Sequence, residues 1–206
     1  MRRCLVRSRG ALSVLAALLL WLGVGPAGAD VSACQPAELF ATDSTDPLFE
    51  LQADVTIAQT GVTVTGSTPL DGVFWSNKLR QITFERSREF HLCGADGSLH
   101  TAAEALRRQF NQEAVLIFDY LPRNAPEANA IAITVPDVDV ARFRDAFVAD
   151  AAAHQRLHGG SVTITDHTLI LVAGNGDLDV ARRLVDEAGG NWNAVAIAHG
   201  RREFVE

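Results

Sequence analysis

The sequence predicts an α+β fold, with one antiparallel or mixed sheet and helices packed on one face. Two observations in the C-terminal half lead to this prediction. The hexapeptide Asp-Val-Asp-Val-Ala-Arg at 137–142 returns as Asp-Leu-Asp-Val-Ala-Arg at 177–182, and an apolar run precedes each copy, at 130–135 and at 168–173. An amphipathic helix is expected after each copy. Each helix has one apolar stripe to bury, and one face of a shared sheet can cover the stripes of both helices.

The two hexapeptides belong to two expected strand–strand–helix units, at 113–158 and 160–189. An earlier strand is expected in each unit, at 114–121 and at 161–165. The acidic residues of both hexapeptides are expected to cap their helices and to meet the positive end of the helix dipole. Two copies are too few for a solenoid, so we interpret the units as an internal repeat that shares one sheet with a final strand or hairpin between 193 and 205.

Residues 49–206 are expected to form this single α+β domain. Alternation and β-branched residues predict one or two strands over 49–65. Apolar residues at four-residue spacing predict a helix over 98–112. Between them, the segment 77–90 fits a helix or a strand, and its periodicity does not decide between the two.

The first 29 residues have the pattern of a signal peptide. Four arginines precede an uncharged stretch of 14 residues from Ala11 to Val24, and small residues follow it up to Ala29. This stretch is too short to span about 30 Å of hydrocarbon comfortably. We expect cleavage after Ala29, an extended lead-in over 30–48, for which we assign no core element, and no stable membrane span in the mature chain. The alternatives are a lipoprotein anchored at Cys34 and an uncleaved anchor.

Cysteine usage fits an exported protein. Cys4 leaves with the signal peptide, so Cys34 and Cys93 are the only thiols of the expected mature chain. Unless Cys34 is acylated, we expect one disulfide between them, which closes a loop of roughly 60 residues and stabilises the fold by roughly 4 kcal/mol. A redox or metal-ligating role is disfavoured because neither cysteine has a CxxC partner or a histidine-rich neighbourhood.

The charge balance excludes nucleic acid as a partner. Cleavage after Ala29 removes four Arg and no acid, which leaves 14 basic and 25 acidic residues and a formal charge of −11. A polyanion would be repelled, and no run of basic residues offsets this field locally. Only Lys78 is a lysine, a bias typical of a GC-rich bacterial genome. The expected partner is an extracellular protein or a small ligand whose identity the sequence does not give.

The clearest metal-ligating pattern is a pair of histidines. His154 and His158 stand at i and i+4, the spacing of the HExxH metalloprotease motif, with Gln155 in place of the general base. A plain site for zinc or another divalent metal can use His154, His158 and Asp150 if the helix continues to Gly159. The competing interpretation is a solvated helix end with histidines near its negative terminus.

Motifs for nucleophilic catalysis are broken or scattered. The nucleophile elbow G-x-S-x-G is absent from the chain. Side chains that can be combined into a triad have no spatial grouping in the sequence: Ser76, Ser87, His91, Asp166 and His167.

Three aromatic residues with polar neighbours, Phe74, Trp75 and Trp192, have the composition of a recognition surface, although tryptophan is more often packed in or against a core. The sequence therefore favours a secreted or cell-surface bacterial binding or interaction module without catalytic activity and without a cofactor. The alternative is a small exported metal-dependent hydrolase that uses His154 and His158.

Overall fold

A computed structural model describes residues 34–76, 81–83 and 86–206, with the backbone alone at 72–76, 81–83 and 158. The predicted signal peptide lies outside the described residues. The strands are β1 (Gln35–Thr42), β2 (Thr63–Ser76), β3 (Gln81–Thr83), β4 (Ser87–Gly94), β5 (Val115–Tyr120), β6 (Ala130–Val135), β7 (Leu157–Thr163), β8 (Leu169–Gly174) and β9 (Ala196–Val205). The helices are α1 (Phe49–Ala58), α2 (Asp96–Gln109), α3 (Val140–Ala149), α4 (Ala151–Arg156), α5 (Leu178–Glu187) and the short 3-10 helix η1 (Trp192–Ala194).

The sheet is antiparallel throughout and closes on itself. Its strand order is β3-β2-β4-β1-β5-β9-β6-β8-β7, and β7 pairs in turn with β2. Eight strands therefore form a ring in which each has two neighbours, and β3 extends β2 as a hairpin outside that ring. Closure leaves the ring without free edges, which are otherwise templates for aggregation.

The ring consists of two halves of the same connectivity. The first half runs β1-α1-β2-β4-α2-β5 and has the spatial order β2-β4-β1-β5. The second half runs β6-α3-α4-β7-β8-α5-β9 and has the corresponding order β7-β8-β6-β9. Strand–helix–strand–strand–helix–strand in this order is the ferredoxin-like motif. The pairs β5–β9 and β2–β7 join the halves.

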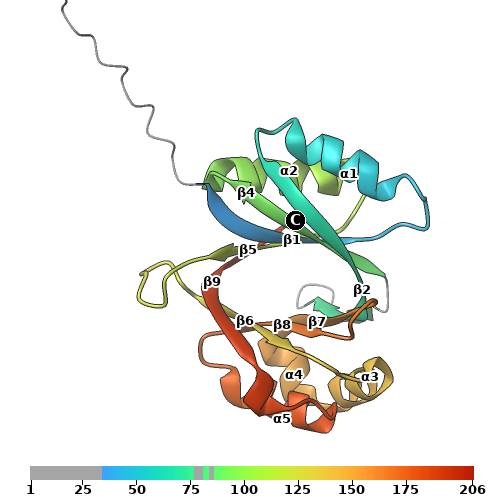
Figure 1. The fold of residues 1–206 in the computed structure, drawn as a ribbon, viewed down its shortest axis with the longest axis vertical. Coiled ribbons are helices and arrows are strands. Elements are labelled where there is room, and N and C mark those ends of the chain that lie inside the picture. The colour runs from blue at the N-terminus through green and yellow to red at the C-terminus, as the bar shows by residue number, and fades with distance from the viewer. Residues whose placement is uncertain (1–33, 77–80, 84–85) are drawn as a thin grey trace, which may run out of the picture. The chain divides into compact units, whose positions relative to one another are not determined.

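The helices cover one face of the sheet, as predicted (Figure 1). In the first half, α1 and α2 pack on β1, β4 and β5 around a buried cluster that includes Leu39, Phe90 and Leu106. In the second half, α3, α4 and α5 pack on β6, β7 and β8. A third buried cluster contains strand residues alone, among them Phe40 and Phe118, and lines the opposite face. Because side chains alternate along a strand, this opposite face is the inside of the ring, and we call it the inner face.

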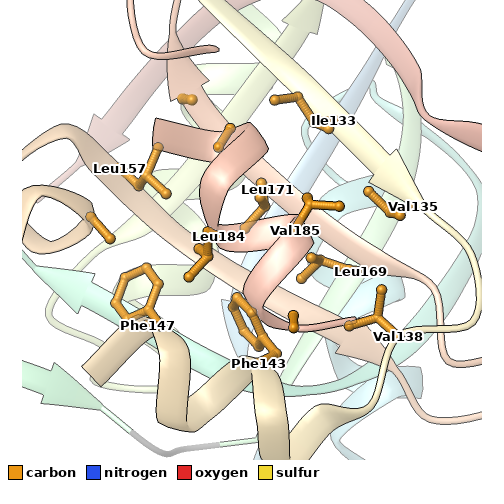
Figure 2. Close-up of a cluster of buried hydrophobic side chains, with 14 of the residues drawn as sticks. Ile133, Val135, Val138, Phe143, Phe147, Leu157, Leu169, Leu171, Leu184 and Val185 are labelled. Atoms are coloured by element: carbon orange, nitrogen blue, oxygen red, sulfur yellow. The ribbon is translucent and has the colours of Figure 1, made fainter. Parts of the chain in front are cut away.

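Figure 2 shows how the second half packs its helices on the sheet. Phe143 and Phe147 of α3 lie among leucines and valines of α5 and β8, and all are fully buried. Close approach is needed here, because a Cβ on Gly160 of β7 would lie 2.6 Å from Phe143 Cζ and 2.5 Å from Leu171 Cδ2. Glycine at this position therefore allows α3 to lie directly on the strand.

The N-terminal part of the domain differs from the expected elements at two points. The lead-in over 30–48 is extended but contains β1, a central strand between β4 and β5. The first part of 49–65, expected as a strand, is the helix α1, and strand β2 begins only at Thr63. Phe49, Ala53 and Ile57 are the buried residues of α1. Their four-residue spacing places them on one helix face and favours a helix, whereas the apparent alternation of apolar and polar residues in the same segment favours a strand.

In the middle of the chain, the observed elements agree better with those predicted from the sequence. The predicted helix over 98–112 is confirmed as α2, which buries Leu99, Ala102, Ala103 and Leu106. The segment 77–90, open between helix and strand, contains β3 and the first part of β4 among its described residues, with Arg86 between them outside any strand. The final segment is one continuous strand, β9, which pairs with β5 of the first half and β6 of the second half.

The interpretation of the two hexapeptides as a duplicated strand–strand–helix unit stays a prediction. Both are followed by helices that pack in one cluster, α3 and α5, but the helices begin at different points of the motif. Asp139 is the N-cap of α3 and accepts a hydrogen bond from the Arg142 backbone N–H, whereas Asp177 is the N-cap of α5 without such a bond. The repetition that the topology does show is the longer ferredoxin-like half.

The predicted disulfide between Cys34 and Cys93 is confirmed, with a Cα–Cα distance of 5.3 Å. Cys34 immediately precedes β1, and Cys93 lies opposite Pro36 in the β1–β4 ladder. The bridge therefore fixes the start of a central strand. In the described part of the chain, no helix combines the length and the hydropathy that a bilayer crossing requires.

Replacing both cysteines, Cys34→Ala with Cys93→Ala, is expected to lower the free energy of unfolding by about 2–4 kcal/mol, because the 59-residue separation is no longer constrained in the unfolded chain. Urea denaturation of the purified, oxidised protein measures this. Wild type with reductant should approach the double variant. A double variant as stable as oxidised wild type would contradict a stabilising bridge.

Candidate functional site

Polar side chains interrupt the inner face where β1, β2, β4 and β5 meet. Phe90 and Leu92 of β4 face the helices, so alternation places Glu89 and His91 on the inner face. The register sets Glu38 of β1 directly opposite His91 and Thr68 of β2 opposite Glu89. With Tyr120 of β5, these residues form what we call the inner cluster: Glu38, Thr68, Glu89, His91 and Tyr120.

Hydrogen bonds connect four members of the inner cluster in a row. His91 Nδ1 lies 2.7 Å from Glu38 Oε2, and Thr68 Oγ1 lies 3.0 Å from His91 Nε2. The Tyr120 hydroxyl donates to Glu38 Oε1 at 3.2 Å. The His91 ring is thus held at both nitrogens, and both oxygens of Glu38 are engaged.

The fifth member, Glu89, has a different environment. The residue is only 7% exposed, whereas the His91 side chain is 38% exposed and that of Glu38 is 13% exposed. Among the described residues, no donor hydrogen-bonds the Glu89 carboxyl. The inner cluster therefore extends from a solvent-accessible imidazole to a buried carboxyl that accepts no hydrogen bond from the part of the chain that the structure describes.

Burial and crowding shift the titration of the inner cluster. Burial, and next the nearby charge of Glu38, raise the pKa of Glu89 from 4.5 to about 7. The hydrogen bond to Glu38 raises the pKa of His91, and burial opposes this effect. Burial and the charges of Glu38 and Glu89 raise the pKa of Tyr120, which therefore stays a neutral donor.

Other polar atoms on strands of the ring are also buried. The Ser87 and Ser161 hydroxyls and Arg202 Nη1 are buried without a hydrogen-bond partner. Ser87 is two residues from Glu89 on the same strand face, and Arg202 lies opposite Phe118 of the inner core in the β5–β9 ladder. Burial lowers the pKa of Arg202. A buried polar atom without a partner calls for a physical reason, such as stored strain, a catalytic role, or a bound water or ion.

The inner cluster allows two kinds of chemistry. Glu38, Glu89 and His91 each offer a ligand atom, and these atoms lie within 4.8 Å of one another, which suits a metal ion. The row Thr68–His91–Glu38 has the hydroxyl–imidazole–carboxylate order in which a histidine accepts a proton while a carboxylate orients its ring.

The histidine pair predicted to bind metal lies elsewhere, and its helical premise does not hold. Helix α4 ends at Arg156, so His154 lies on the helix and His158 in strand β7. Asp150 caps α4 by accepting hydrogen bonds from the Ala152 and Ala153 backbone N–H groups. Asp150 also pairs with Arg183 at 2.6 Å, and the His154 ring lies 5.4 Å from that of Phe147. The side chain of His158 lies outside the described residues, so this metal site stays a prediction.

The three predicted recognition aromatics are only partly described. Trp192 begins η1, is half-buried against the second-half core, and lies under the Arg182 guanidinium at 5.7 Å from its ring centroid. This position agrees with the packing role that is commoner for tryptophan. The side chains of Phe74 and Trp75 lie outside the described residues, and their recognition role stays a prediction.

Sequence reasoning identified only one residue of the inner cluster. His91 appeared among scattered triad candidates, while Asp166, named with it, hydrogen-bonds the Thr163 and Thr168 hydroxyls instead. One signal was present: Glu89 and His91 alternate with Phe90 and Leu92, which indicates a strand with a polar inner side. Glu38 was not predicted as a site residue because its segment was not assigned to the core.

Comparisons with known proteins add no functional information. No family model matches the chain, and no curated protein matches it. A solved structure assigned as a glycine cleavage system transcriptional repressor aligns at 14% identity and a TM-score of 0.29, covering 84% of this chain and 98% of that one. A protein assigned as a monooxygenase from Lactobacillus acidophilus NCFM aligns at 11% identity and a TM-score of 0.29, with 83% and 96% covered. An anthrone oxidase-like protein aligns at 9% identity and a TM-score of 0.27, covering 85% of this chain and 94% of that one. TM-scores this low do not indicate what this protein does.

The substitution Glu89→Gln is expected to change how stability depends on pH. A carboxyl with a raised pKa binds its proton more tightly in the folded chain, so the unfolding free energy of wild type should fall as pH rises from about 4.5 to about 7, by about 3 kcal/mol from Glu89. The raised pKa of His91 adds a decrease in the same direction above its unfolded value of 6.5.

Urea denaturation at pH 5 and pH 8, in a buffer with chelator, measures this dependence. Glu89→Gln should be close to wild type at pH 5 and more stable at pH 8. The matched control is Glu127→Gln, at an exposed position in the loop between β5 and β6, which should follow wild type at both pH values. Parallel curves for wild type and Glu89→Gln would show that Glu89 is not the buried acid described above.

Proposed function

We propose that the protein is an exported bacterial binding protein that takes a small cationic ligand at the inner cluster. The observation that supports this most directly is the convergence of Glu38, Glu89 and His91, whose ligand atoms lie within 4.8 Å of one another. Two carboxyl groups at this spacing repel each other when both are ionised, and burial strengthens the repulsion. A cation between them removes this cost.

Charge and access support a small cation. The expected mature chain carries a formal charge of −11, which raises the local concentration of cations and disfavours anions. The half-exposed His91 side chain gives contact with solvent, while Glu89 is 7% exposed. A small ion or compact head group can reach both, whereas a macromolecular surface cannot reach the buried carboxyl.

The disulfide supports export. Bridges of this kind persist in oxidising compartments and are rare in the reducing cytosol, and Cys34 follows closely after the proposed cleavage site at Ala29. An engaged Cys34 thiol also disfavours the lipoprotein alternative, in which that same sulfur carries the lipid.

Intact mass spectrometry of the exported protein tests this part of the proposal. We expect a mature N-terminus at Asp30 and the mass of the oxidised chain without lipid, since the small residues before Asp30 suit signal peptidase. An acylated Cys34 or a full-length chain retained by cells would contradict it.

Ligand binding is tested with defined cations. Mature protein is screened by thermal shift and calorimetry with zinc, manganese, calcium, putrescine and choline. At least one probe should bind saturably, and at 100 times its Kd it should stabilise the fold by about 2.7 kcal/mol. Glu89→Gln should lose this effect, because one of the two converging carboxylates is removed.

The matched control is Glu203→Gln. Glu203 also pairs with a histidine, His100, at 2.8 Å, but the pair is exposed and lies outside the inner cluster. This variant should bind like wild type. If no cation binds, or if Glu203→Gln abolishes binding as fully as Glu89→Gln, the proposed site is wrong.

A second candidate function, acyl-ester hydrolysis with Thr68 as nucleophile, is favoured by one observation. Thr68 Oγ1 lies 3.0 Å from His91 Nε2, and the other ring nitrogen faces Glu38 at 2.7 Å. Release of nitrophenol from an activated ester that is lost in Thr68→Val would favour this candidate. The metal-dependent hydrolase that uses His154 and His158 stays a prediction from the sequence.

A further inference from the structure

We infer that the cation is a divalent transition-metal ion, bound by Glu38, Glu89 and His91. This inference rests on the proposed function and names the ligand class of the same site. Zinc forms bonds of about 2.0–2.2 Å to histidine nitrogen and carboxylate oxygen, which sets ligand atoms roughly 3–4 Å apart. Ligand atoms within 4.8 Å of one another reach that arrangement through small rotamer adjustments.

The position of Glu89 points to a ligand independently of the Glu38–His91 pair. The residue is nine-tenths buried, no donor among the described residues hydrogen-bonds its carboxyl, and one of its oxygens lies within 4.8 Å of the other two ligand atoms. Buried carboxylates are ordinarily paired with a donor or coordinate a metal. The buried Ser87 hydroxyl, two residues away on the inner side of β4, also has no hydrogen-bond partner.

The remaining members of the inner cluster are placed as supporting residues of a metal site. With His91 Nδ1 on the metal, its Nε2–H can donate to Thr68 Oγ1, which already lies 3.0 Å away. Tyr120 donates to Glu38 Oε1, which orients the carboxylate and leaves Oε2 for the ion. Such outer hydrogen bonds typically fix the orientation of metal-ligating histidines and carboxylates.

The donor set selects the class of metal. One imidazole nitrogen with two carboxylate oxygens suits zinc, manganese or another first-row ion, whereas calcium and magnesium prefer all-oxygen sites with more ligands. Three protein ligands leave a coordination position open to water. Zinc should bind more tightly than manganese, in the usual affinity order of these ions.

The test uses chelator-treated mature protein and zinc as the probe. Calorimetry and metal analysis should give one zinc per chain. Glu89→Gln and His91→Gln should weaken binding at least 100-fold, and Thr68→Val about 10–100-fold with the stoichiometry unchanged. The matched control His100→Gln, in the exposed His100–Glu203 pair, should bind like wild type. Circular dichroism of each metal-free variant checks that it folds, and the visible spectrum of bound cobalt reports the ligands directly.

Three results would overturn the inference. The first is that wild type binds no stoichiometric zinc. The second is that zinc binding survives both Glu89→Gln and His91→Gln. The third is that binding is lost only in His154→Ala with His158→Ala, which would assign the metal to the histidine pair instead. If putrescine or choline binds in a Glu89-dependent manner and zinc does not, the metal inference fails while the proposed function stands. If neither zinc nor an organic cation binds, both fail.

Discussion

Closure of the sheet through the β2–β7 and β5–β9 pairings is the constraint on which the rest of the structure depends. In an open sheet of the same strands, one face would be covered by helices and the other would meet water. Closure turns the second face inward, where it packs a core made only of strand residues. Glu89 therefore stands in a desolvated position, and its raised pKa follows from this burial more than from any neighbour.

The paired strands β1 and β4 carry three members of the inner cluster, Glu38, Glu89 and His91, and the disulfide lies at one end of the same pair. Glu38 and His91 are direct partners in the β1–β4 ladder, and two residues further along the ladder Pro36 lies opposite Cys93, which bridges to Cys34. Backbone pairing and a covalent bond thus fix the spacing of the two strands where the side chains meet. A site whose supporting strands cannot slide keeps its geometry at little entropic cost on binding. This arrangement is consistent with binding by a preformed site.

The sequence predicted the fold class, the helix α2 and the Cys34–Cys93 bridge, because amphipathic spacing and cysteine count are local signals. It misassigned α1, where Phe49, Ala53 and Ile57 compete with an apparent alternation, and it left β1 out of the core. The site was largely hidden for a related reason. Glu38, Thr68 and Glu89 come together only through the register of strands that are distant in the sequence, which is a long-range property that no short motif encodes.

The most direct test of the account is anomalous diffraction from crystals of the mature protein grown with zinc. The account predicts a closed eight-stranded ring and one strong anomalous peak between Glu38, Glu89 and His91, with Thr68 on the second nitrogen of the imidazole. An anomalous peak only at His154 and His158, an inner cluster that binds no ion at saturating zinc, or a sheet open between β2 and β7 would contradict it.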